Sequence, residues 1–216
     1  TSDTFAGLGG VGWVEEHNLG RYYTELLHQQ QSPLTQTVAD DLDDRLAMHV
    51  AALERLAHRL RGPGGRDAAA LRQELVDSGL RTMFDGIGII GLDGLMRVTD
   101  RPAGNAPGAP VSLADRDYFK QAVASGRAVI SPPVVSRVTG QPVVVMVVPL
   151  RNESGALSGL IGATLALARP NVLGRLAQAR VGETGYYTVS TQEAGPRYVV
   201  HPDAARLLQP AASGAA

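Results

Sequence analysis

Five consecutive residues, Asp115-Arg116-Asp117-Tyr118-Phe119, combine side-chain types that suit the binding of a small anion. At the mouth of an apolar pocket, the guanidinium of Arg116 would hold a carboxylate through two parallel, charge-assisted hydrogen bonds. Tyr118 would add an aromatic wall with a polar tip. Two plainer roles stay open: an ion pair of Arg116 with Asp115 or Asp117 on an exposed turn, and simple core packing for Phe119.

Other patterns that could carry chemistry are weaker. Residues 7–12 spell G-x-G-x-x-G, but no strand precedes them and no acidic residue follows at the spacing of a dinucleotide site. The 5 histidines form no metal-ligand spacing, and no serine lies in a G-x-S-x-G context. The acidic run at residues 40–44 is typical of a helix start, where negative charge is favoured by the helix dipole. We therefore expect no enzymatic activity, no metal site and no cofactor.

Composition narrows the class of protein further. The chain has 216 residues, of which 44% are hydrophobic and 19% charged, so it can bury a globular core. A net charge of −1 disfavours a nucleic-acid partner, and the lack of cysteine excludes disulfides and thiolate sites. No stretch reaches the ~18 apolar residues of a membrane span. If the chain belongs to a receptor, we expect its membrane helices to lie outside this sequence.

The elements that must position Arg116 include a long amphipathic helix. After a glycine-rich leader, residues 21–31 predict a short helix, and Ser32-Pro33 is a good start for the next one. Over residues 34–60 the apolar side chains recur every three or four positions, at Val38, Leu42, Leu46, Val50, Leu53, Leu56 and Leu60. Such a helix spans about 40 Å, more than a small domain needs for itself, which is typical of a dimer seam or a signalling rod.

A sheet is predicted after a second helix at residues 67–78. Residues 84–100 hold two short apolar runs around Asp93-Gly94, a strong hairpin signal. The remaining elements are predicted in this order: a Pro/Gly loop at 101–110, a helix capped by Ser112 at 113–124, strands at 128–136, 142–150 and 158–167, a linking helix at 171–180, and strands at 182–190 and 196–202. This order predicts an α+β fold, an antiparallel sheet with helices against one face.

Three segments resemble, in the same order, the double Cache family of PAS-like sensors. They are DRDYFKQAVASG (115–126), SRVTGQPVVVMVVPLRNESGALSGLIGATLAL (136–167), and GETGYYTV with HPD (182–189 and 201–203). The resemblance implies a PAS-like antiparallel sheet with a long N-terminal helix, of Cache type. It also implies a division of the chain into a leader (1–31), a signalling helix (32–62), a membrane-distal module (66–168), a linker helix (169–180) and the start of an incomplete membrane-proximal module (181–216). The last hairpin would either begin that module or pack back on the distal one.

The resemblance implies the extracytoplasmic sensor region of a bacterial receptor, the periplasmic part of an inner-membrane protein. Chemoreceptors, histidine kinases and diguanylate cyclases carry such modules, and a homodimer through the long helix is possible. Two alternatives stay open. One is a ligand-free interaction module that dimerises through Leu46, Val50 and Leu53. The other is a cytoplasmic PAS-like domain with a cofactor, against which the long helix and the DRDYF motif weigh.

Ligand residues follow from the resemblance too. In the family, the distal ligand lies between the sheet and a loop-plus-helix with an R-x-W-Y-like motif, here Arg116, Tyr118 and Phe119. Thr164 stands where amino-acid-sensing members carry an aspartate that resembles an ammonium anchor, and threonine cannot neutralise an ammonium. The resemblance therefore implies a small carboxylate without an amine, or another small anion.

Two further residues are candidates for the lining of this pocket. Strand alternation makes Met146 a candidate for the floor, although methionine in such a run is more often plain core. Asp100, with Arg101, lies in the loop after the hairpin and is expected to form part of a lid.

Overall fold

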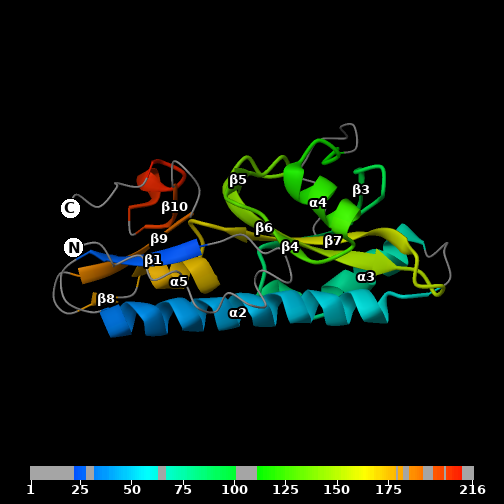
Figure 1. Ribbon diagram of the computed structural model, residues 1–216. Helices are drawn as coiled ribbons and strands as arrows, with labels where there is room; N and C mark the ends of the chain where they lie inside the picture. The colour runs from blue at the N-terminus through cyan, green and yellow to red at the C-terminus, as the bar shows by residue number, and fades with distance from the viewer. Residues whose placement is uncertain are drawn as a thin grey trace.

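In the computed structural model, one long helix runs beneath two antiparallel sheets (Figure 1). The structure describes residues 22–27, 32–62, 67–100, 111–178, 180–181, 185–191, 197–201 and 203–210. The G-x-G-x-x-G stretch and the loop with Arg101 lie outside these residues. The long helix, α2 (Ser32–Arg59), has 28 residues and confirms the helix predicted from the apolar stripe. A second helix, α3 (Ala68–Asp77), follows it and is capped by the side chain of Asp67.

The larger sheet is built from the predicted hairpin and the predicted strands. Its strands are β2 (Gly86–Ile90), β3 (Met96–Thr99), β4 (Val129–Ile130), β5 (Val134–Val135), β6 (Pro142–Arg151) and β7 (Leu157–Ala166). They are ordered β3-β2-β7-β6-β4, with β5 also paired to β6. The single strand predicted over 128–136 is split in two because Pro132 and Pro133 have no N–H to donate to the ladder.

Helices cover both faces of this sheet, so the expectation of helices against one face is wrong (Figure 1). On β6, alternate side chains point to opposite sides. Val144, Met146 and Val148 belong to the core cluster that contains the α2 stripe. Val143, Val145 and Val147 belong to a second cluster, packed beneath α4 (Asp117–Ser125). Below, these sides of the sheet are called the α2 face and the α4 face.

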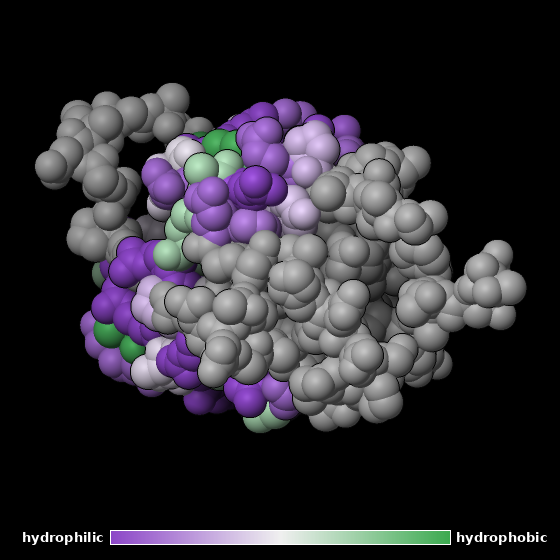
Figure 2. Space-filling view, turned by 90° about the vertical axis from the view of Figure 1, so that its left-hand side faces the viewer, coloured by the Kyte–Doolittle hydropathy of each residue, from purple (hydrophilic) through white to green (hydrophobic). Residues whose placement is uncertain are grey.

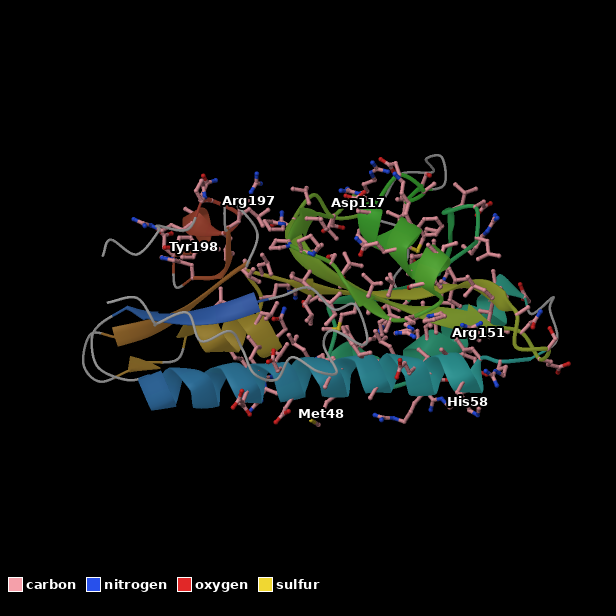
Figure 3. All side chains as sticks on the ribbon, viewed as in Figure 1. Met48, His58, Asp117, Arg151, Arg197 and Tyr198 are labelled. Atoms are coloured by element: carbon pink, nitrogen blue, oxygen red, sulfur yellow. The ribbon has the colours of Figure 1, made fainter. Side chains whose placement is uncertain are left out.

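The apolar stripe of α2 packs against its own sheet. Leu46, Val50 and Leu53 are only 4%, 3% and 0% exposed within the single chain. They are therefore not available as the seam of a dimer, because an amphipathic helix beside a sheet uses its apolar stripe to build the core. Met48, on the outer side of α2, is 64% exposed and points away from the sheet (Figure 3).

Helix α4 begins later than predicted. Ser112 does not cap it, because residues 111–113 pair with the hairpin instead: Met96 N donates to Val111 O at 2.9 Å and Leu113 N to Gly94 O at 2.8 Å. The helix starts at Asp117, with Arg116 in the N-cap position. Its predicted end is confirmed at Gly126, which has a left-handed φ of 62°.

The smaller sheet joins the two ends of the chain. It contains β1 (Tyr22–Leu27), β8 (Arg180–Val181), β9 (Gly185–Thr191) and β10 (Tyr198–Val200), in the order β1-β9-β10 with β8 on β9. The short helix predicted over residues 21–31 is wrong, since all six residues of β1 pair with β9 and tyrosine and threonine favour strands.

This sheet shares a core with the rest of the molecule. Helix α5 (Val172–Gln178) links it to β7. Val199 and Val200 of β10, with Leu207, lie in the same cluster as Leu42 of α2. The short helices η1 (Leu80–Thr82) and η2 (Ala204–Arg206) complete the described elements. At this end of the molecule the visible described surface is mainly hydrophilic (Figure 2).

Two features of the described residues concern membranes and metals. None of the helices there is both long enough and apolar enough to cross a membrane. Within the same residues, no group of three or more histidine, aspartate or glutamate side chains is arranged to hold a metal ion.

Candidate functional site

Arg116 lies where the loop before α4 meets the turn after β5. Its Nη2 donates a hydrogen bond to the carbonyl oxygen of Val135 at 2.9 Å. Its Nε is buried and has no hydrogen-bond partner in the part of the chain that the structure describes. A buried donor without an acceptor costs free energy, on the order of 1–3 kcal/mol, and more when the group is charged. The site therefore contains a guanidinium donor that the described protein atoms do not satisfy.

The neighbouring carboxylate is engaged elsewhere. Arg137 donates from Nη1 and Nη2 to the two oxygens of Asp115, at 2.5 and 2.6 Å. Arg137 Nη1 also donates to the carbonyl oxygen of Ser112 at 2.7 Å. These hydrogen bonds lower the pKa of Asp115 from 3.8 to about 2. Sequence reasoning missed this pair because its partners are 22 positions apart.

Tyr118 and Phe119 form the inner surface of α4. Each is 6% exposed and packs in the α4-face core with Ile90 and Leu160. Burial raises the pKa of the Tyr118 hydroxyl, while the positive charges of Arg116 and Arg137 oppose that rise. The structure thus places Arg116 and the two aromatic residues in one region, between α4 and the sheet.

Thr164 lies on this same side of the sheet. In register it stands between Gly86 of β2 and Val145 of β6, and its Oγ1 is 3.5 Å from the carbonyl oxygen of Gly86. Beside it, Gly88 of β2 faces Gly162 of β7. Gly86, Gly88 and Gly162 therefore leave three positions of the α4 face without a side chain. Sequence reasoning missed the glycines of β2.

Side chains from the sheet close over part of this glycine surface. A Cβ at Gly88 would lie 2.7 Å from the sulfur of Met96, and one at Gly162 would lie 3.0 Å from Cδ1 of Ile90. Glycines inside strands mark places where another group approaches the backbone closely. Here the approaching groups are an unbranched methionine, which adapts readily, and an isoleucine.

Two predicted site residues are not brought to this region. Met146 is fully buried on the α2 face, because its strand neighbours Val145 and Val147 take the α4 face. Asp100 is 4% exposed and does not form a lid. Its Oδ1 accepts from Ile87 N at 3.0 Å and its Oδ2 from Arg81 Nε at 3.1 Å, so the carboxylate fixes the start of β2.

Comparison with known proteins agrees with this architecture. The Cache domain family model (dCache_1) matches residues 16–213. No curated protein sequence matches the chain. Among solved structures, the ligand-binding domain of the Pseudomonas aeruginosa PAO1 amino acid chemoreceptor PctC in complex with GABA has a TM-score of 0.62 and 21% identity, covering 81% of this chain and 75% of that one.

Two other chemoreceptor domains are similar to the same extent. The Pseudomonas fluorescens chemoreceptor CtaA in complex with L-serine has a TM-score of 0.65 and 21% identity, covering 81% of this chain and 72% of that chain. The Pseudomonas aeruginosa PAO1 amino acid chemoreceptor PctB in complex with L-Arg has a TM-score of 0.61 and 20% identity, covering 81% and 70%. At such identities the likeness shows a shared fold. The family model spans nearly the whole sequence, and the chain therefore belongs to the Cache domain family.

Proposed function

We propose that the chain is the extracytoplasmic, ligand-binding sensor region of a bacterial transmembrane receptor, and that its ligand is a small carboxylate. Membership of the Cache family supports the sensor role, and the solved chemoreceptor domains support it further. One observation carries the choice of ligand: the buried Nε of Arg116 has no partner among the described residues. The division into a distal module (66–168) and the start of a proximal module (181–216) is part of the same proposal.

The guanidinium of Arg116 is held ready for an anion. Its hydrogen bond to Val135 fixes the plane of the group, and Asp115 does not compete for it because Arg137 occupies both oxygens of that carboxylate. A carboxylate that accepts from Nε would satisfy the orphaned donor and gain a charge-assisted hydrogen bond. A neutral acceptor, such as the hydroxyl group of an alcohol, would also satisfy the donor, but that hydrogen bond would lack the contribution of a negative charge.

The floor and walls of the proposed site are available from the same face. Gly88 and Gly162 supply a surface of bare backbone, and Tyr118 supplies an aromatic wall. Met96 lies over this floor, so a ligand would enter by moving its flexible side chain. Phe119 then packs α4 against the sheet.

Among the described residues that flank β2, an amine on the ligand would find no carboxylate that is not already hydrogen-bonded. The solved relatives are described in complex with GABA or amino acids, which carry an ammonium as well as a carboxylate. Thr164 is neutral, and the carboxylates that flank β2 are both engaged. Asp85 Oδ2 accepts from Ala166 N and from Asn171 Nδ2, each at 2.8 Å, and Asp100 is bound to Arg81 and Ile87. Supported by these contacts, the proposed ligand is a carboxylate without an amine.

Ligand binding would be passed to α2 through the sheet. β6 presents Val145 to the α4 face and Val144 to the α2 face, where it shares a core with Leu53. Because packed cores deform little, a shift of α4 against β6 is expected to move α2. A ligand changes this equilibrium only by its difference in affinity for the two states. In this proposal the receptor's signalling output is that of a chemoreceptor, a histidine kinase or a diguanylate cyclase.

The proposal is tested by a thermal-shift screen of the purified chain with carboxylates, amino acids, amines and purines. At about 100 times Kd, a ligand that binds only the folded state adds nearly 3 kcal/mol of stability. We expect a dose-dependent rise in melting temperature with carboxylates, absent in Arg116→Ala and retained in Arg97→Ala, which removes an exposed arginine paired with Asp93. A rise that persists in Arg116→Ala would refute the site. No rise with any class would favour a ligand-free interaction module, whose contact surface would have to lie outside the buried stripe of α2.

A further inference from the structure

A cavity of about 550 Å³ lies away from the α4 face, between the C-terminal end of α2, the start of β4 and the end of β6. Its charged lining residues are Glu54, His58, Arg61, Arg127 and Arg151. Figure 3 shows His58 and Arg151 at the same end of the molecule. This basic groove has three guanidinium groups and one carboxylate, so its lining carries an excess of positive charge.

Arg151 is fixed at the edge of the groove by the backbone. Its Nη1 donates to the carbonyl oxygen of Gly155 and its Nη2 to that of Gly126, each at 3.0 Å. Gly126 has a φ of 62°, and a Cβ there would lie 3.0 Å from Arg151 Nη2, so the glycine permits this approach. The guanidinium is half-buried and oriented, with remaining N–H groups free to donate to a ligand.

Two of the three guanidinium groups of the groove, those of Arg61 and Arg151, have no carboxylate partner among the described residues. Glu54 lies one turn before His58 on α2, and the buried Ala57 between them keeps the groove open. Arginine clusters with fixed guanidinium groups suit carboxylate and phosphate groups, which accept two parallel hydrogen bonds.

We propose that the basic groove is a second ligand site, which binds a small multivalent anion with two or more carboxylate or phosphate groups. Arg61 and Arg127 bind one end of the anion and Arg151 the other. A ligand held in this way joins the end of α2 directly to β4 and β6. The groove lies beside α2 and Arg116 lies at the N-terminus of α4, so the two sites are formed by different residues.

Isothermal titration calorimetry of the purified chain tests this, with citrate and pyrophosphate as probes at constant ionic strength. We expect saturable binding with one site per chain, and the stronger of the two probes identifies the group that the groove prefers. Loss of one charge-assisted hydrogen bond corresponds to a weakening of about tenfold or more, which is expected for Arg61→Ala. Arg55→Ala removes an equal charge from the same helix, outside the groove, and should change the affinity less than about twofold.

Two more variants control for misfolding and for binding of the probes at the Arg116 site. Glu54→Gln removes the single carboxylate of the groove and should tighten binding of both probes, a gain that misfolding cannot produce. Arg116→Ala should leave their binding unchanged. The proposal is overturned if neither probe saturates a site, if Arg55→Ala weakens binding as much as Arg61→Ala, or if Arg116→Ala abolishes it.

Discussion

Arg137 and Asp115 form a two-pronged ion pair, with oxygen–nitrogen distances of 2.5 and 2.6 Å. Asp115 directly precedes Arg116 in the chain, and its carboxylate is bound to Arg137 and not to Arg116. Of the two ion pairs considered for Arg116 from the sequence, the one with Asp115 is therefore replaced by the pair of Asp115 with Arg137. Arg116 keeps a buried Nε with no acceptor among the described residues, which is the basis of the proposed carboxylate site.

The Asp115–Arg137 pair predicts a small dependence of stability on acid. The pKa of Asp115 is depressed to about 2, so the pair stabilises the fold above the ordinary value of 3.8 and is lost as pH falls toward 2. We expect Asp115→Asn to melt slightly below the native protein at pH 6 and at the same temperature near pH 2. Melting curves by circular dichroism measure this, and a difference that grows toward low pH would contradict the assigned pairing.

For Asp43 we expect the opposite dependence of stability on pH. Partial burial, with repulsion from Asp40 and Asp44, raises its pKa from 3.8 to about 6. The folded state then binds the proton more tightly than the unfolded state, so stability falls as pH rises from about 4 to about 6. After allowance for solvent screening, Asp43→Asn should raise the melting temperature by about 1–3 °C at pH 7.5. The gain should vanish near pH 4, and an equal gain at both pH values would show that ionisation is not its cause.

The packing of α2 predicts which of its apolar residues hold the single chain together. Leu53 is fully buried against the sheet, so Leu53→Ala should lower the free energy of unfolding by about 2–5 kcal/mol. Met48→Ala, on the exposed side, should change it by less than about 0.5 kcal/mol. Urea unfolding at two protein concentrations measures both. If the effect of Leu53→Ala depended on concentration, the stripe would be acting as a dimer seam.

Thr164 predicts how the ligand class could be changed. Thr164→Asp places a carboxylate on the α4 face beside Gly86, where an ammonium could bind it. We expect the preference for propionate over L-alanine, which differ in the amine, to shift toward L-alanine by about tenfold or more. Thr164→Asn is the neutral control of the same shape. An equal shift in both variants would mean that charge at this position does not select the ligand.

Much of the fold is predictable from the sequence because local patterns decide it. The three- and four-residue spacing from Leu42 to Leu60 predicts α2, and Asp93-Gly94 predicts the turn between β2 and β3. The element order and the matching segments also predict the Cache fold. The helix expected at residues 21–31 failed because β1 exists only through pairing with β9, more than 150 positions away, as Tyr22 with Thr191 shows.

The site is less predictable because it depends on which face of the sheet each residue takes. Alternation groups Met146 with Val144 and Val148, but it does not say that this group faces α2. Asp100 follows the hairpin and looks like loop, yet it folds back to bind Ile87 N. Arg116 was found from residue type and motif, whereas its unpartnered Nε and the ion pair beside it require coordinates.

Direct titration of a carboxylate into the native chain and into Arg116→Ala tests the central claim, using the best compound from the thermal screen. Loss of the charge-assisted hydrogen bonds should weaken binding by about tenfold to a hundredfold or more, while Arg97→Ala binds as the native chain does. Circular dichroism of the variants confirms that the fold is kept. Equal dissociation constants for the native chain and Arg116→Ala would contradict the account, because the buried Nε would then not be the group that binds the ligand.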